Sequence, residues 1–175
     1  KRNAHIYVFG FPIPKFFGYV ICLSIGFVSG YMYLEEQSPK VFSSEGVKSW
    51  NVCFSPNGNC EKLVIQAINS AKKSIHLRAY SFTSKSIADA LIDAKERGVQ
   101  LHIQMDKSQL DEKYSQLNHL KQAGIPVKIE KAIGIAHNKV IVIDEHIVLT
   151  GSYNWTNAAQ KRNKENLLVI HDPQL

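Results

Sequence analysis

Apolar residues recur along the chain with two different periods. Spacings of three to four residues predict three helices, over residues 61–73, 86–97 and 110–123. Alternating or continuous apolar positions predict five strands, over residues 74–82, 99–105, 127–129, 140–143 and 147–150. Strands that alternate with helices are typical of an α/β fold, so we expect a layered, mixed β-sheet flanked by helices.

The longest apolar run lies near the N-terminus. Residues 16–34 contain no charged side chain, and as a helix they would rise about 28 Å, enough to cross a bilayer. We expect a transmembrane anchor; a cleaved signal segment is the main alternative, and a buried core helix is less favoured. Lys1, Arg2 and Lys15 precede the run, which predicts a cytoplasmic N-terminus with the rest of the chain across the membrane.

The pattern therefore divides the chain into four parts. Residues 1–15 form a basic flank, 16–34 the anchor or signal segment, 35–50 a linker without sustained period, and 51–175 the folded domain. In a bacterium this domain would be periplasmic or extracellular, either membrane-anchored or secreted. Residues 16–34 would then be the chain's contact with the membrane.

Two of the three cysteines stand at the start of the predicted domain. Cys53 and Cys60 enclose the segment FSPNGN, whose Pro, Asn and Gly residues favour a tight turn. Such a turn can bring the two sulfurs together, and a local disulfide fits a domain outside the cytoplasm. Two free thiols are the alternative. A zinc site is disfavoured because no second Cys or His pair stands nearby.

The net charge of the chain is +6, from 21 Lys and Arg against 15 Asp and Glu. Three basic residues precede the apolar run and no acidic residue does, which leaves 18 basic against 15 acidic residues, a net charge of +3 for the rest. Half of the net charge thus comes from residues that are predicted to set the membrane orientation, and it says little about a polyanionic partner. With 45% hydrophobic and 21% charged residues, the composition excludes a disordered polyelectrolyte and a multi-pass membrane protein.

The candidate chemistry lies between residues 136 and 170. His137 and Lys139 are two positions apart, so on a strand their side chains would leave the same face. The hairpin predicted from 140–143 and 147–150 would bring Ser152 and Asn154 close to them. A neutral imidazole can attack phosphorus, and an ammonium with hydroxyl and amide donors can stabilise the charge of the transition state. Neither a metal nor another cofactor is expected, because clustered carboxylates are absent.

Together with Asp144 and Gly151, these residues form the pattern HxKxxxxDxxxxxxGSxN. This pattern is similar to the HKD motif of the phospholipase D superfamily, without a substitution, and the chain most resembles short, single-motif bacterial members. The resemblance implies a phospholipase D-like fold and hydrolysis of phosphodiesters through a phosphohistidine. We interpret Gly151 as structural, and Asp144 as a residue that orders the turn after its strand.

The resemblance also implies roles for the other residues. His137 matches the nucleophile, while Lys139, Ser152 and Asn154 match phosphate-binding positions. Glu165 matches a carboxylate that hydrogen-bonds the nucleophilic histidine and fixes its tautomer.

One motif supplies only one histidine, although cleavage needs a nucleophile on one side of phosphorus and a general acid on the other. We therefore expect a homodimer in which two copies of His137 share one active site. A nonspecific nucleic-acid endonuclease is favoured by the resemblance and by a local cluster of Lys161, Arg162 and Lys164. Hydrolysis of membrane phospholipids to phosphatidate and a free head group is the alternative, and an inactive, membrane-anchored binding protein is less favoured. A narrow basic groove would indicate the first, an apolar collar the second.

Overall fold

The computed structural model describes residues 6–8, 11–13, 49–131 and 133–173. The chain divides into two units, Lys1–Ser43 and Ser44–Leu175. The expected anchor at 16–34 lies outside the described residues, and no helix within the described ranges is long and apolar enough to cross a membrane. In the first unit, strands β1 (Ile6–Val8) and β2 (Phe11–Ile13) form an antiparallel pair that the sequence pattern had not indicated.

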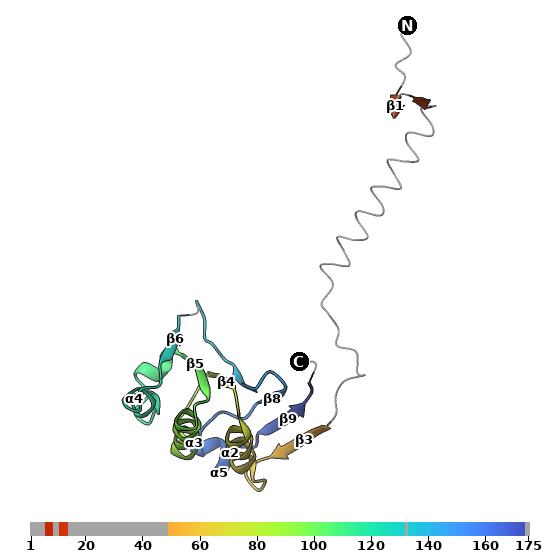
Figure 1. Ribbon diagram of the computed structural model, residues 1–175. Helices are drawn as coiled ribbons and strands as arrows, with labels where there is room; N and C mark the ends of the chain where they lie inside the picture. Colours follow the sequence, from red (N-terminus) through yellow and green to blue (C-terminus); the bar gives the residue numbers. More distant parts are fainter. Residues whose placement is uncertain (1–5, 9–10, 14–48, 132, 174–175) are drawn as a thin grey trace. The chain divides into compact units, whose positions relative to one another are not determined.

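The second unit contains a mixed sheet of seven strands in the order β3-β9-β8-β7-β4-β5-β6 (Figure 1). The strands are β3 Ser49–Phe54, β4 Ser74–Ala79, β5 Gln100–Asp106, β6 Val127–Glu130, β7 Lys139–Ile143, β8 Ile147–Gly151 and β9 Asn166–His171. Strands β4, β5 and β6 run parallel, and the other neighbours are antiparallel. The prediction of a layered, mixed sheet is confirmed.

Helices cover one face of this sheet. They are α2 Cys60–Ser70, α3 Lys85–Glu96, the 3₁₀ helix η1 Lys107–Leu110, α4 Leu117–Gln122 and α5 Asn157–Lys161. Ile68 of α2 and Leu91 of α3 are fully buried in one core with Leu77 of β4 and Ile141 of β7. Burial of this apolar surface is the main force that holds the helices on the sheet.

Two elements differ from the predicted pattern. The helix expected over 110–123 is shortened to α4 at Leu117–Gln122. Its expected apolar start, Leu110, is 57% exposed and ends the preceding 3₁₀ helix η1, which Asp106 caps by accepting from the Ser108 N–H. The domain also begins earlier than expected, since Ser49 and Trp50 pair with β9 and belong to β3. Residues 49 and 50 are therefore part of the sheet and not of the linker.

The strand directions gather distant parts of the chain at one edge of the sheet. The C-terminal ends of β3, β4, β5, β6 and β8 lie there together with the N-terminal ends of β7 and β9. Loops at this edge, called the active edge below, contain residues 55–58, 80–84, 107–116, 131, 133–138, 152–156 and 163–165. His137, Ser152, Asn154 and Glu165 fall in these loops, and Lys139 and Gly151 lie directly beside them.

Candidate active site

His137 lies at the active edge, two residues before β7 begins at Lys139. Its side chain is exposed, whereas Lys139 is buried with 7% of its surface accessible. The Lys139 ammonium donates a hydrogen bond to the backbone oxygen of His137 at 3.1 Å, so the two residues are fixed to one another. The site thus pairs an accessible imidazole with a sheltered positive charge.

Tyr80 contacts both of these residues, and the motif does not contain it. Its ring meets the His137 ring edge-on, with centroids 4.4 Å apart and an interplanar angle of 61°. The Lys139 nitrogen lies 5.0 Å from the centre of the same ring, within range of a cation–π interaction. Strand register explains the contact: Ala79 pairs with Lys139, so the residue after Ala79 lies beside those that precede Lys139. Sequence spacing alone carries no signal for this pairing.

Burial lowers the pKa of Lys139 from its usual 10.5, and the nearby charge of Glu165 partly opposes this shift. A desolvated ammonium interacts more strongly with a developing negative charge than an exposed one does. The electrostatic influence of Glu165 on Lys139 also places the predicted carboxylate in the same neighbourhood.

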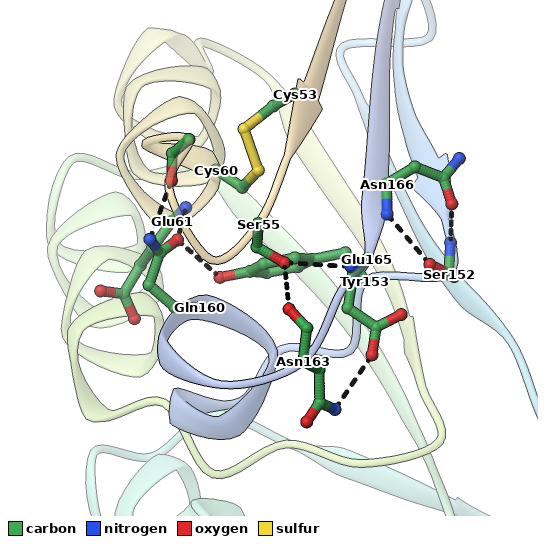
Figure 2. The surroundings of a disulfide bond; sticks show 11 residues. Cys53, Ser55, Cys60, Glu61, Ser152, Tyr153, Gln160, Asn163, Glu165 and Asn166 are labelled. Atoms are coloured by element: carbon green, nitrogen blue, oxygen red, sulfur yellow. Dashed lines mark hydrogen bonds between the residues drawn. A yellow bond between two sulfur atoms is a disulfide. The ribbon is translucent and has the colours of Figure 1, made fainter.

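Gly151 ends β8 where its backbone passes close to β9. A Cβ at this position would lie 2.2 Å from the backbone oxygen of Asn166, and the φ of +150° also disfavours a side chain. Ser152 follows directly and exchanges two hydrogen bonds with Asn166: its N–H donates to Oδ1 at 3.2 Å, and its Oγ accepts from the Asn166 N–H at 3.0 Å (Figure 2). The close approach that glycine permits therefore orients the predicted phosphate-binding hydroxyl.

Asn154, the amide of the motif, has an unusual environment. Its Oδ1 is buried and has no hydrogen-bond partner, which is true of no other buried side-chain oxygen or nitrogen in the described ranges. An unpaired buried acceptor costs about 1–3 kcal/mol, and a role in catalysis is one physical reason for such a group to be kept.

Glu165 is held by the segment that follows the disulfide-linked Cys53. Its backbone oxygen accepts from the Ser55 N–H at 3.0 Å, and its N–H donates to Ser55 Oγ at 3.3 Å. The side-chain amide of Asn163 donates to Glu165 Oε1 at 3.0 Å (Figure 2). None of the hydrogen bonds among the described residues joins Glu165 to His137, so its orienting role stays a prediction.

A surface pocket of about 560 Å³ opens beside Ser152 and Glu165. It is lined by Phe54, Ser55, Pro56, Asn57, Ser152, Lys164, Glu165 and Asn166. Phe54 and Pro56 give the pocket an apolar part, and its other lining residues are polar or charged. His137, Lys139 and Asn154 are not part of this lining, so the structure places the predicted residues along one edge but only two of them in this pocket.

Asp144 lies at the opposite edge of the sheet. The five residues of β7, about 17 Å of extended chain, separate it from the active edge. Its carboxylate accepts three backbone hydrogen bonds, from the N–H groups of Lys72, Lys73 and Ser74 at 2.7–2.9 Å. Partial burial raises its pKa, but these hydrogen bonds outweigh that effect, and the pKa lies below its usual value. Asp144 therefore joins the β7–β8 turn to the start of β4.

Cys53 and Cys60 form a disulfide, with Cα atoms 5.5 Å apart (Figure 2). The bond joins the end of β3 to the first residue of α2, and both cysteines are buried. It encloses residues 54–59, which include Ser55 with its hydrogen bonds to Glu165, and so it stabilises one wall of the pocket.

The two aromatic residues beside the motif asparagine are both fully buried. Tyr153 donates to Gln160 Oε1 at 3.2 Å, and burial raises its pKa well above the usual 10.0, helped by the charges of Glu61 and Glu165. Trp155 donates from Nε1 to the Arg78 backbone oxygen at 3.1 Å. Both side chains pack in the core instead of facing a substrate. Within the described ranges, no group of three or more His, Cys, Asp or Glu side chains could hold a metal ion.

A family model described as "Cardiolipin synthase, PLD-like domain" matches residues 64–175. A phospholipase D of Rickettsia bellii is 49% identical over 125 residues, which cover 71% of this chain and 62% of that protein. The mitochondrial cardiolipin hydrolase of Xenopus laevis is 36% identical over 111 residues, 63% of this chain and 52% of the relative. The match thus spans less than two thirds of the length of these curated relatives.

Solved structures show the same fold. The crystal structure of Nuc from Salmonella typhimurium, a phospholipase D family member, is similar with a TM-score of 0.68 and 41% identity, over 71% of this chain and 83% of that one. NucT from Helicobacter pylori gives a TM-score of 0.60 and 28% identity, over 72% and 88% of the two chains. The resemblance that the motif indicated is confirmed: the chain belongs to the phospholipase D superfamily of phosphodiesterases.

Proposed function

We propose that this domain hydrolyses phosphodiester bonds without a metal, through a phosphohistidine on His137. The observation that carries the proposal is the pairing of an exposed His137 imidazole with the buried Lys139 ammonium, at the same edge of the sheet as the oriented hydroxyl of Ser152. A neutral imidazole is a competent nucleophile, and the buried charge is placed where a phosphoryl group would develop negative charge.

The reaction has two displacements. An imidazole nitrogen of His137 attacks phosphorus, the bond from phosphorus to the leaving oxygen breaks, and a general acid protonates that oxygen. Water then attacks the phosphohistidine, loses its proton to the same group acting as base, and the phosphorus–nitrogen bond breaks to release the phosphomonoester and His137. Lys139, Ser152 and Asn154 stabilise the phosphoryl oxygens in both steps.

The general acid comes from a second copy of the chain. Each chain supplies one motif histidine, and one imidazole cannot stand on both sides of the phosphorus. We propose a homodimer in which the two His137 side chains face each other across a two-fold axis. The position of His137 on an exposed loop at the active edge supports this arrangement, because it leaves the imidazole accessible to a partner.

Nucleic acid is the substrate that we favour. Lys161, Arg162 and Lys164 are all exposed in the segment that leads to Glu165, and Lys164 lines the pocket. A cationic rim attracts a chain of phosphates more strongly than it attracts a single head group. The resemblance to single-motif bacterial members, which include a nonspecific endonuclease, supports the same choice.

One observation favours phospholipid as a second candidate. Phe54 lines the pocket and is 64% exposed, and it continues along β3 with Trp50 at 62% and Val52 at 44%. Residues two apart on a strand share a face, so these three side chains form an apolar stripe that ends at the pocket. The names of the relatives from Rickettsia bellii and Xenopus laevis agree with such a substrate.

The full chain, incubated in EDTA, tests both candidates. Single-stranded DNA, RNA, double-stranded DNA and phosphatidylcholine vesicles would each be assayed beside bis(p-nitrophenyl) phosphate. We expect hydrolysis of the small diester and of single-stranded nucleic acid, with loss of both in His137→Ala. Full activity of His137→Ala, or complete inhibition by EDTA, contradicts the mechanism; release of head groups with intact DNA assigns the lipid substrate instead.

We also propose that residues 16–34 hold the domain at a membrane, outside the cytoplasm. The Cys53–Cys60 disulfide supports this location, because disulfides persist mainly in oxidising compartments. Protease added to intact bacterial spheroplasts that express the chain should digest the domain; protection until lysis would place it in the cytoplasm.

A further inference from the structure

A second pocket opens at the active edge, on the side of α3 and α5. Its volume is about 510 Å³, and its walls come from the loop after β4, the loop before α4 and the helix α5. The pocket is close to the motif along the chain, because Asn157 in its wall follows Asn154 by three residues. The Thr83 N–H, from the opposite wall, donates to the Trp155 oxygen at 3.0 Å.

The lining of this pocket is cationic. Lys85, Lys113 and Arg162 contribute to it, and no Asp or Glu does. Lys85 is neutralised locally by Asp89 at 2.7 Å, whereas no ion pair with a carboxylate is found for Lys113 or Arg162 in the described ranges. The Glu112 carboxylate accepts from the Tyr114 N–H at 3.1 Å but does not line the pocket. Two exposed cations in the lining, without a carboxylate beside them there, favour the binding of an anion.

An exposed aromatic ring stands beside these cations. Tyr114 lines the pocket with 66% of its surface accessible, and the Lys113 nitrogen lies 5.3 Å from its ring centre. Cations that follow a phosphate backbone, combined with aromatic rings on which bases stack, are the pattern by which proteins bind single-stranded nucleic acid.

We propose that this second pocket, defined by Lys113, Tyr114 and Arg162, binds a phosphodiester and a base of the substrate strand next to the bond that is cleaved. The inference rests on the proposed function and names its substrate class. A nucleic-acid strand carries a phosphate at every nucleotide and can occupy His137 and this pocket at once. A phospholipid with one phosphodiester cannot do so.

Binding can be measured separately from catalysis. The full chain with His137→Ala would be titrated against a fluorescent 20-nucleotide single-stranded DNA at several salt concentrations. Adding Lys113→Ala and Arg162→Ala should lower the slope of log affinity against log salt by about 1.4, since each lost phosphate contact removes about 0.7. This change in slope predicts that the double variant binds the DNA about 25-fold more weakly than the parent at 0.1 M salt. Tyr114→Leu should weaken binding by about fivefold or more, and Tyr114→Phe much less.

The matched control is the pair Lys121→Ala and Lys128→Ala, two exposed lysines on α4 and β6, which should leave affinity and slope unchanged. Circular dichroism would verify folding, and Lys113→Arg should retain most of the affinity. Equal DNA affinities of the parent and the double variant overturn the inference. In that case the proposed function still stands if the unaltered chain hydrolyses bis(p-nitrophenyl) phosphate. No binding of DNA by the parent overturns the inference together with the choice of nucleic acid as substrate, but not the hydrolytic mechanism. Loss of binding to phosphatidylglycerol vesicles, with DNA binding retained, assigns the pocket to a head group and also overturns it.

Discussion

Lys139 combines a positive charge with burial, and this combination has a measurable consequence. Because burial holds its pKa below 10.5, the ammonium loses its proton at a lower pH than an exposed lysine would. Activity that needs the charge should therefore fall as the pH rises through this lowered pKa. Lys139→Arg should reduce kcat at pH 7 by about tenfold, since a guanidinium does not fit the same geometry, and should move the alkaline limb of kcat/KM to higher pH. An unmoved limb would assign that titration to another group.

Tyr80 is predicted to position both motif side chains. Its edge contact with His137 and its cation–π contact with Lys139 each contribute about 0.5–1.5 kcal/mol. Tyr80→Leu should therefore lower kcat by roughly 10-fold with little change in KM, and Tyr80→Phe should restore most of the rate. If both variants are equally slow, the hydroxyl and not the ring carries the effect.

At the scale of elements, the hairpin of β7 and β8 contains a turn that its sequence does not favour. Asp144 and Glu145 have φ values of +52° and +65°, and the His146 N–H donates to the Ile143 oxygen at 3.1 Å. Positive φ at both central residues matches a type I′ turn, for which Asp-Gly is preferred. Glu145→Gly should stabilise the domain by about 0.5–1 kcal/mol in urea unfolding, because glycine adopts this backbone without steric conflict. Glu145→Ala, which keeps a Cβ, should give no such gain.

The disulfide stabilises the junction of β3 and α2. Closing a loop of this size restricts the unfolded chain by about 2–3 kcal/mol. A variant with Cys53→Ser and Cys60→Ser should have a lower Tm and a lower free energy of unfolding by that amount, and added reductant should lower the Tm of the unaltered chain alone. If the Cys53→Ser, Cys60→Ser variant has the same Tm as the unaltered chain, the bond does not stabilise the domain.

Most elements with a regular apolar period were predictable, apart from the helix expected over 110–123, whereas β3 and α5 were not. The predicted helix over 86–97 appears as α3 at Lys85–Glu96, because its apolar face is fully buried. Strand β3 carries only one buried residue, so its pattern looked like linker and loop, and α5, with five residues, is too short to show a period. The motif residues could be named from spacing, whereas Tyr80 and Asn166 reach the site only through strand register and β8–β9 pairing.

At the scale of the whole molecule, a shared active site predicts how activity depends on the fraction of unaltered chains in a mixture with an inactive variant. If each site needs His137 from two chains, refolding unaltered chains together with an excess of His137→Ala should make activity fall as the square of the unaltered fraction. Independent monomers would give a linear decrease. Light scattering on the same samples should show a dimer throughout, and an active monomer would contradict the proposal.

His137 and Asp144 lie at opposite ends of β7, one beside the reactive groups and the other where the sheet is held together. The end of β7 at the active edge carries the reactive groups, while its other end is tied by three backbone hydrogen bonds to the start of β4. Substitutions at the first end can abolish reactivity without loosening the sheet. The domain is therefore suited to conversion, by evolution or by engineering, into a stable but inert scaffold. Such descendants would keep Asp144 and Gly151 but carry other residues in place of His137 and Lys139.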